Sequence, residues 1–267
     1  MHLRWAVSVT LLSGVFANAQ INSGTIVVFN QTPSGFFIAA DSRANYDDPR
    51  APDDNQCKIS AFQSSHLVFA TSGAMGYVSS GISDSVQTWN AHDEIAIPKK
   101  WHKPVPANAT EALNRLTVPW ANRMKNRWQE TFLAHSEILH SVTARQRGGV
   151  LTKGIFAIAF KGKIAIAMVQ MMYTEAGVKA VFYDDMKCMA GVTICGIGKI
   201  EVVSEHLLQG PFMSSSDQLS RLIKLVELTE TEDKSGDVGG PIDALEMSND
   251  GTITWKQKKE VCPKSKN

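Results

Sequence analysis

Two short apolar runs near the N-terminus constrain the fold more than any other feature of the chain. They span 25–30 and 35–41, are rich in Val, Ile and Phe, and flank the turn-forming segment Gln31-Thr32-Pro33-Ser34. This pattern predicts two antiparallel strands joined in a hairpin. Because Thr25 opens the first strand and Asp41 closes the second, the hairpin places this hydroxyl and this carboxylate at the same end of the sheet.

The composition suits one large domain and argues against two classes of binding protein. At 267 residues the chain is long enough for a sizeable core, and its net charge is +1 with no long basic run. Composition therefore gives no support for binding nucleic acid or an acidic membrane surface. We expect a single domain over 25–256. No cysteine pair or cysteine and histidine cluster has zinc spacing, and nothing in the sequence implies a metal or an organic cofactor.

The N-terminal residues have the pattern of an export signal. A short basic start at 1–4 precedes an almost wholly apolar or small stretch at 5–16 and the small-x-small sequence Ala17-Asn18-Ala19. The apolar stretch is too short for a comfortable membrane span. We therefore expect a signal peptide over 1–19, a secreted or periplasmic protein without a membrane span after its removal, and a short pro-segment over 20–24. A first core strand or an anchor is the alternative.

Export would make the cysteines candidates for disulfide bonds. The four of them allow three pairings, between which the sequence does not choose: Cys57, Cys188, Cys195 and Cys262.

The predicted elements follow one another in blocks. A second strand pair is predicted at 58–62 and 66–71, and helices at 74–89 and from Asn108, where Glu111 is the capping-box partner. The remaining predicted elements are strands at 154–160, 163–171 and 178–183, helices at 200–208 and 217–231, and strands at 240–247 and 252–256. This order predicts an α+β fold of two packed sheets with a helix layer outside each.

Two further segments are predicted to lack regular structure. Gly196-Ile197-Gly198-Lys199 is predicted to be a turn, because it lacks the spacing of a phosphate loop. The lysine-rich tail over 257–267 is predicted to be flexible.

Thr25 is the candidate nucleophile of the hairpin. A threonine hydroxyl becomes a nucleophile only with a base in hydrogen-bond reach, and a chain cut before Thr25 would supply its own α-amino group. Such an amine has an ordinary pKa of about 7.7–8.0, so part of it is neutral near pH 7. Lys58 is the candidate for the nearby positive charge, with Asp41 to pair with it and orient it. A turn at Ser72-Gly73-Ala74 would offer N–H donors to an oxyanion.

These residues resemble the proteasome β-type, N-terminal-nucleophile (Ntn) hydrolases of the threonine-peptidase class. The resembling motifs are Gly24-Thr25, Gly35 with Ala39-Ala40-Asp41-Ser42-Arg43-Ala44, Cys57-Lys58-Ile59, and Ala70-Thr71-Ser72-Gly73. They cover 23–75, and a second similar stretch covers 237–255. The resemblance implies an αββα sandwich of four layers, self-cleavage between Gly24 and Thr25, and assembly into a homo-oligomer. It further implies Thr25 as nucleophile, with Asp41 and Lys58 as charged partners and Gly73 as oxyanion donor.

One motif departs from the family. The serine that supports the nucleophile just before Gly239-Gly240 is replaced by Val238, and Ser235 and Asp237 are the candidates to substitute for it.

Two hypotheses about function follow. In the first, the chain is an exported hydrolase of peptides or other small amides. In the second, it is a non-catalytic binding or assembly protein of the same fold that retains 20–24. Simpler readings of the residues also stand: Thr25 as an ordinary strand residue, Asp41 as a turn cap or partner of Arg43, and Lys58 as a solvated edge charge.

Overall fold

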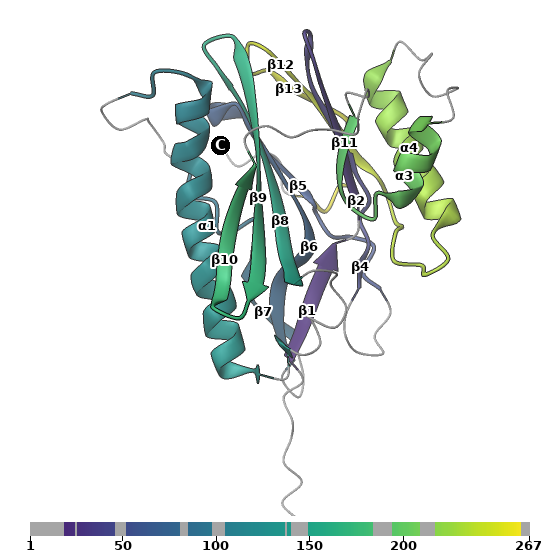
Figure 1. Cartoon of the computed structure of the whole chain (residues 1–267). Coiled ribbons are helices and arrows are strands. Elements are labelled where there is room, and N and C mark those ends of the chain that lie inside the picture. The colour runs from purple at the N-terminus through teal and green to yellow at the C-terminus, as the bar shows by residue number, and fades with distance from the viewer. Residues whose placement is uncertain are drawn as a thin grey trace, which may run out of the picture.

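Two antiparallel sheets and their flanking helices make up an α+β fold (Figure 1). The structure is a computed structural model, and it describes residues 19–24, 26–45, 52–80, 85–97, 105–136, 138–139, 149–183, 194–208 and 217–262. Every pairing between the described strands is antiparallel.

The larger sheet, sheet A, has eight strands in the described part of the chain. Six of them follow the order β10 (Gly177–Tyr183), β9 (Lys163–Thr174), β8 (Val150–Phe160), β6 (Leu67–Ser80), β1 (Ala19–Gly24) and β4 (Ala44–Asn45). The other two, β5 (Ile59–Phe62) and β7 (Ser85–Asn90), also pair with β6. A 3-10 turn, η1 (Gln63–Ser65), joins β5 to β6. Strand β6 is therefore the centre of the sheet, and β1 lies directly beside it.

A single residue separates β1 from β2 (Ile26–Thr32), which belongs to the smaller sheet, sheet B. Its five strands follow the order β11 (Ile194–Gly198), β2, β3 (Gly35–Ala40), β12 (Asp243–Ser248) and β13 (Ile253–Gln257). The chain thus leaves sheet A at Gly24 and enters sheet B at Ile26, so the Thr25 position joins the two sheets.

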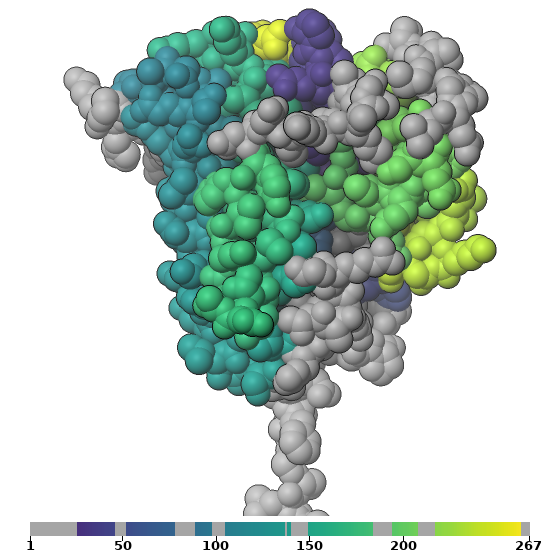
Figure 2. Space-filling view, in the orientation of Figure 1, coloured from purple at the N-terminus to yellow at the C-terminus, as the bar shows by residue number. Residues whose placement is uncertain are grey.

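The helices lie on opposite sides of the molecule (Figures 1 and 2). Helix α1 (Ala109–Ala134) packs on sheet A, whereas α3 (Glu201–Leu208) and α4 (Gln218–Glu232) pack on sheet B. The Asn108 side chain caps α1 by accepting the Glu111 N–H at 2.9 Å. Helix α1 contains Pro119.

Three hydrophobic clusters join the sheets and helices. The first lies between α1 and sheet A and contains Trp120 and Phe156. The second lies between the two sheets, and the third between sheet B and helices α3 and α4. Alternate residues of β2 enter different clusters, Val27 the second and Val28 the third. Strand β2 is therefore buried on both faces, which fixes the backbone that follows Thr25.

The structure corrects three predictions of secondary structure. The helix predicted over 74–89 is the end of β6 followed by β7, because these residues pair with β1 on one side of β6 and with each other. Ser72-Gly73-Ala74 is not a turn but part of β6. The turn predicted at 196–199 is mostly strand β11, paired with β2. In each case partners distant in the chain decide the conformation.

The C-terminal segment also differs from the predicted flexible tail. Lys259 and Cys262 are buried, and a disulfide joins Cys262 to Cys57. Cys195 is disulfide-bonded as well, whereas Cys188 lies outside the described residues. The described helices include none that is long and apolar enough to cross a membrane.

Candidate active site

The predicted nucleophile, Thr25, lies outside the described residues, but both of its neighbours are placed. Gly24 ends β1 in sheet A and pairs with Gly73 of β6. Ile26 opens β2, is fully buried, and donates its N–H to Asp41 Oδ1 at 3.1 Å. The residues on either side of Thr25 are therefore each fixed by their contacts, Gly24 in sheet A and Ile26 in sheet B.

Asp41 and Lys58 form a buried ion pair. Their side chains are 1% and 0% exposed, and Lys58 Nζ donates to Asp41 Oδ1. The second carboxylate oxygen, Oδ2, accepts the N–H of Gly239 at 3.2 Å. Since Asp41 also accepts the N–H of Ile26, this carboxylate connects the start of β2, the start of β5 and the segment before β12. The pairing between Asp41 and Lys58 predicted from the sequence is present.

Burial sets the ionisation of Lys58. The loss of solvent lowers its pKa below the ordinary value of 10.5, and the adjacent Asp41 carboxylate only partly opposes this effect. A lysine in such an environment is a compact positive charge that loses its proton more easily than one at the surface. It is thus suited to stabilise a negative oxygen that develops nearby.

Gly73 occupies a position in β6 that demands glycine. Its φ is +78°, and a Cβ at this position would lie 2.7 Å from the carbonyl oxygen of Leu151. It pairs with Thr152 of β8 on one side and with Gly24 on the other. The predicted oxyanion donor therefore lies opposite the residue that precedes Thr25.

Ser235 and Asp237, the predicted supporting residues, belong to a separate polar cluster. Ser235 Oγ donates to Asp237 Oδ2 at 2.8 Å, and Lys199 Nζ lies 2.5 Å from the same oxygen and 3.0 Å from Asp233 Oδ1. Their side chains face Lys199 and Asp233. The cluster reaches the ion pair through the backbone, because Gly239, two residues after Asp237, donates to Asp41.

Asp233 organises this cluster. Its Oδ2 accepts the N–H groups of Asp237 and Val238 at 2.8 and 3.0 Å. Burial raises the pKa of Asp233, but hydrogen bonds from Ser235, Lys199 and the backbone outweigh burial and lower it to about 2. Val238, which replaces the family's serine, is 1% exposed and contributes its N–H rather than a hydroxyl.

Three residues around the ion pair were not predicted from the sequence as site residues: Ser42, Gly239 and Lys259. Ser42 and Gly239 lie within the quoted motifs, so the resemblance offered a signal for them. Lys259 had no signal, because it belongs to a segment predicted to be flexible.

No protein-family model and no curated protein matches the chain. Solved structures do match it over most of its length. Anbu (ancestral beta-subunit) from Yersinia bercovieri is 14% identical with a TM-score of 0.49, and the alignment covers 89% of each chain. The Anbu (Gly-1) mutant from Hyphomicrobium sp. strain MC1 is 14% identical with a TM-score of 0.48, and the Anbu structure from the same strain is 15% identical with a TM-score of 0.45. Each covers 91% of this chain and 89% of its own.

What the fold and the site define is an α+β protein with a buried aspartate–lysine pair beside the junction of its two sheets.

Proposed function

We propose that the chain is an exported Ntn amide hydrolase with the four-layer αββα sandwich of the proteasome β-type subunits. It acts through an acyl-enzyme on Thr25 after cleaving its own Gly24–Thr25 bond. The observation that carries the proposal is the buried Asp41–Lys58 pair, one hydrogen bond from the backbone that follows Thr25.

Maturation and turnover share the Thr25 hydroxyl as nucleophile, but the α-amino group of Thr25 is free to act as base only in turnover. In maturation the Thr25 hydroxyl adds to the Gly24 carbonyl, the Thr25 nitrogen departs, and water hydrolyses the resulting ester to a Gly24 carboxylate. The freed α-amino group then accepts the hydroxyl proton during attack on a substrate amide and passes a proton to the leaving amine. Lys58 stabilises the developing negative charge, Asp41 orients Lys58, and the backbone at Gly73 binds the oxyanion.

The register of β1 supports cleavage at this bond. The strand pairs with β6 along Ala19–Gly24 and with β4 at Ser23 and Gly24. Its last residue lies opposite Gly73, so the carbonyl to be attacked is in the strand that runs beside the predicted oxyanion donor. An extended peptide or another small amide would bind in this place once β1 has left.

The Cys57–Cys262 disulfide is compatible with an exported protein. A disulfide that links residues 205 positions apart is typical of an oxidising compartment, as expected for a secreted or periplasmic chain.

The same strand favours a second candidate, a non-catalytic binding or assembly protein. If the 24–25 bond stays intact, β1 remains part of sheet A, blocks the α-amino group and fills the position beside Gly73.

The mature N-terminus separates the two candidates. Intact mass and N-terminal sequencing of the expressed full chain are followed over time, beside Thr25→Ala and the control Thr32→Ala at the far end of β2. We expect wild type and Thr32→Ala to begin at Thr25, and Thr25→Ala to retain 20–24. A wild-type chain that begins at Gln20 and does not change would exclude the hydrolase.

A further inference from the structure

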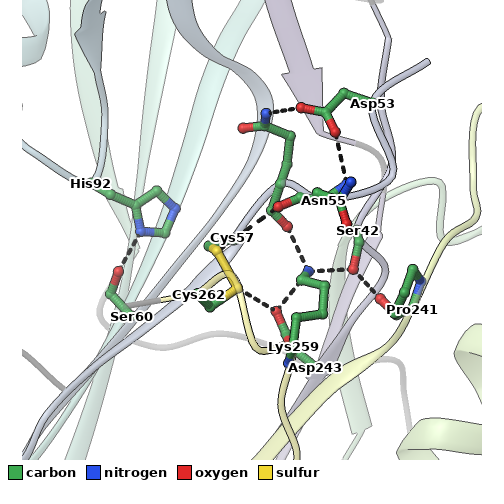
Figure 3. Close-up of a disulfide and its surroundings, with 11 residues drawn as sticks. Ser42, Asp53, Asn55, Cys57, Ser60, His92, Pro241, Asp243, Lys259 and Cys262 are labelled. Carbon is green, nitrogen blue, oxygen red and sulfur yellow. Dashed lines mark hydrogen bonds and ion pairs between the residues drawn. A yellow bond between two sulfur atoms is a disulfide. The ribbon is translucent and has the colours of Figure 1, made fainter. Parts of the chain in front are cut away.

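The C-terminal segment carries a second buried lysine to the edge of the candidate site. Lys259 is 8% exposed, and its ammonium donates to three oxygens: Asp243 Oδ2 at 2.8 Å, the Gln56 carbonyl at 2.7 Å, and Ser42 Oγ. These contacts use all three protons of the ammonium group. Figure 3 shows the Lys259 side chain between Ser42 and Asp243, next to the disulfide. A lysine so enclosed has a fixed position and not the freedom of a surface residue.

A short run of hydrogen bonds connects Lys259 to Asp41. Ser42, which accepts from Lys259, directly follows Asp41 and donates its hydroxyl to the Pro241 carbonyl. The Ser42 N–H donates to the Gly239 carbonyl at 3.1 Å, and the Gly239 N–H donates to Asp41 Oδ2 at 3.2 Å. Lys259 therefore helps to fix the Gly239–Pro241 segment that holds one oxygen of the Asp41 carboxylate.

The disulfide anchors both ends of this arrangement. Cys57 immediately precedes Lys58, and its partner Cys262 lies three residues after Lys259. The Cys262 N–H also donates to the Lys259 carbonyl at 3.3 Å. One covalent bond thus ties the backbone of Lys58 to the segment that carries Lys259.

The charges around the two lysines are interdependent. The groups that act on Lys58 include Asp41, Asp54 and Lys259, and Lys259 in turn is paired with Asp243. Burial has the largest effect and lowers the pKa of Lys58. The positive charge of Lys259 lowers it further, whereas Asp41 and Asp54 raise it. Removal of the Lys259 charge would therefore raise the pKa of Lys58.

We propose that Lys259 is a positioning residue for the Asp41–Lys58 pair, and that the Cys57–Cys262 disulfide latches it in place. The inference rests on the proposed function of the same site and adds a part of the chain that the resembling motifs do not include. Lys259 touches no reacting atom. It acts through Ser42 and Gly239 on the orientation of Asp41, and through its charge on the proton of Lys58.

Two readouts test the proposal in the full-length protein. The first is the rate at which the chain beginning at Thr25 appears, measured against pH. The second is the titration of the Lys58 ammonium by NMR of labelled lysine in the uncleaved Thr25→Ala chain, with the signal assigned by its loss in Lys58→Met. The second readout needs no activity, so it decides the positioning role even if wild type fails to mature and the hydrolase proposal falls.

The variants are Lys259→Met, which keeps the length of the side chain without its charge, and Cys57→Ser with Cys262→Ser. The matched control is the neighbouring Lys258→Met, whose ammonium lies 5.3 Å from the centre of the Trp255 ring. Both test variants should raise the pKa of Lys58, slow maturation by about ten- to a hundredfold and shift the pH profile of the maturation rate toward higher pH. Lys258→Met should match wild type in all three.

The two changes should also be coupled, because they act on one arrangement. Lys259→Met should slow maturation and raise the pKa of Lys58 less in the Cys57→Ser, Cys262→Ser chain than it does in wild type. A Lys58 titration and a maturation pH profile unchanged in Lys259→Met would overturn the positioning role, even if the variant melts at a lower temperature. A normal Lys58 titration in the Cys57→Ser, Cys262→Ser chain, together with a shifted one in Lys259→Met, would overturn the latch.

Discussion

At the residue scale, the candidate site depends on a charge pair that water does not reach. Asp41 and Lys58 are 1% and 0% exposed, and each would be costly to bury alone. The carboxylate is compensated by Lys58 and by the N–H groups of Ile26 and Gly239. Loss of one partner leaves the other as an uncompensated buried charge, whereas loss of both does not.

This asymmetry gives a stability prediction. Lys58→Met should lower the free energy of unfolding by about 3–5 kcal/mol, and Asp41→Asn combined with Lys58→Met should cost less than the two single variants together. Urea unfolding in the Thr25→Ala background measures both without interference from maturation. As a control, Lys224→Met breaks the exposed Lys224–Glu227 pair and should change stability by less than about 1 kcal/mol. Strictly additive losses would contradict the coupling.

The sequence predicts some of these residues and not others for a physical reason. Asp41 closes one short apolar run and Lys58 opens another. The local pattern and the family resemblance therefore both single out these two residues. Lys259 contacts Ser42 across 217 positions of sequence, and nothing local marks a lysine in a polar tail as buried. The sequence likewise predicts Ser235 and Asp237 as supporting residues, although only the fold shows that their side chains face Lys199.

At the element scale, β6 shows where sequence patterns mislead. A helix is predicted from the sequence over 74–89, although this stretch contains the strand-favouring residues Tyr77, Val78 and Trp89. In the structure β6 continues to Ser80, because β1 and β7 provide hydrogen-bond partners on its two edges. β1 comes from the predicted pro-segment, so no pattern within 74–89 reveals it. By contrast, the helix predicted from Asn108 is confirmed as α1, because its capping residues are local in the sequence.

The Asp233 turn, between α4 and β12, gives a prediction of pH dependence. The pKa of Asp233 falls from 3.8 to about 2 in the folded chain, so the ionised form binds its partners better than the protonated form does. Its stabilisation is therefore complete above pH 3.8 and disappears as pH falls toward 2. Asp233→Asn should lower the free energy of unfolding by about 2 kcal/mol at pH 7. Unfolding curves from pH 7 to pH 2 should show that the difference in unfolding free energy between wild type and Asp233→Asn shrinks below pH 3.8. A difference that stays constant with pH would show that it does not come from the Asp233 charge.

At the scale of the whole molecule, the site lies where the two sheets meet the segment that carries Lys259. Sheet A supplies Gly73, sheet B begins with Ile26, and the C-terminal segment closes the arrangement through Lys259. The block order of the elements was enough to predict two sheets with flanking helices. The order of strands and the disulfide partner were not predictable, because both depend on contacts between distant segments, and three cysteine pairings fit the sequence equally.

The disulfide should stabilise the molecule far beyond the site. It joins residues 205 positions apart, and in the chain-entropy account a cross-link over a long loop restricts the unfolded chain most. The Cys57→Ser, Cys262→Ser variant should therefore lose about 2–5 kcal/mol of unfolding free energy, toward the upper end because the loop is long. Lys259→Met, which keeps the disulfide, should lose less. Urea unfolding of both variants without added reductant, which keeps the disulfide of Cys195 intact, measures the difference. Equal losses in the two variants would show that the bond stabilises the chain only by holding Lys259, and not by restricting the unfolded state.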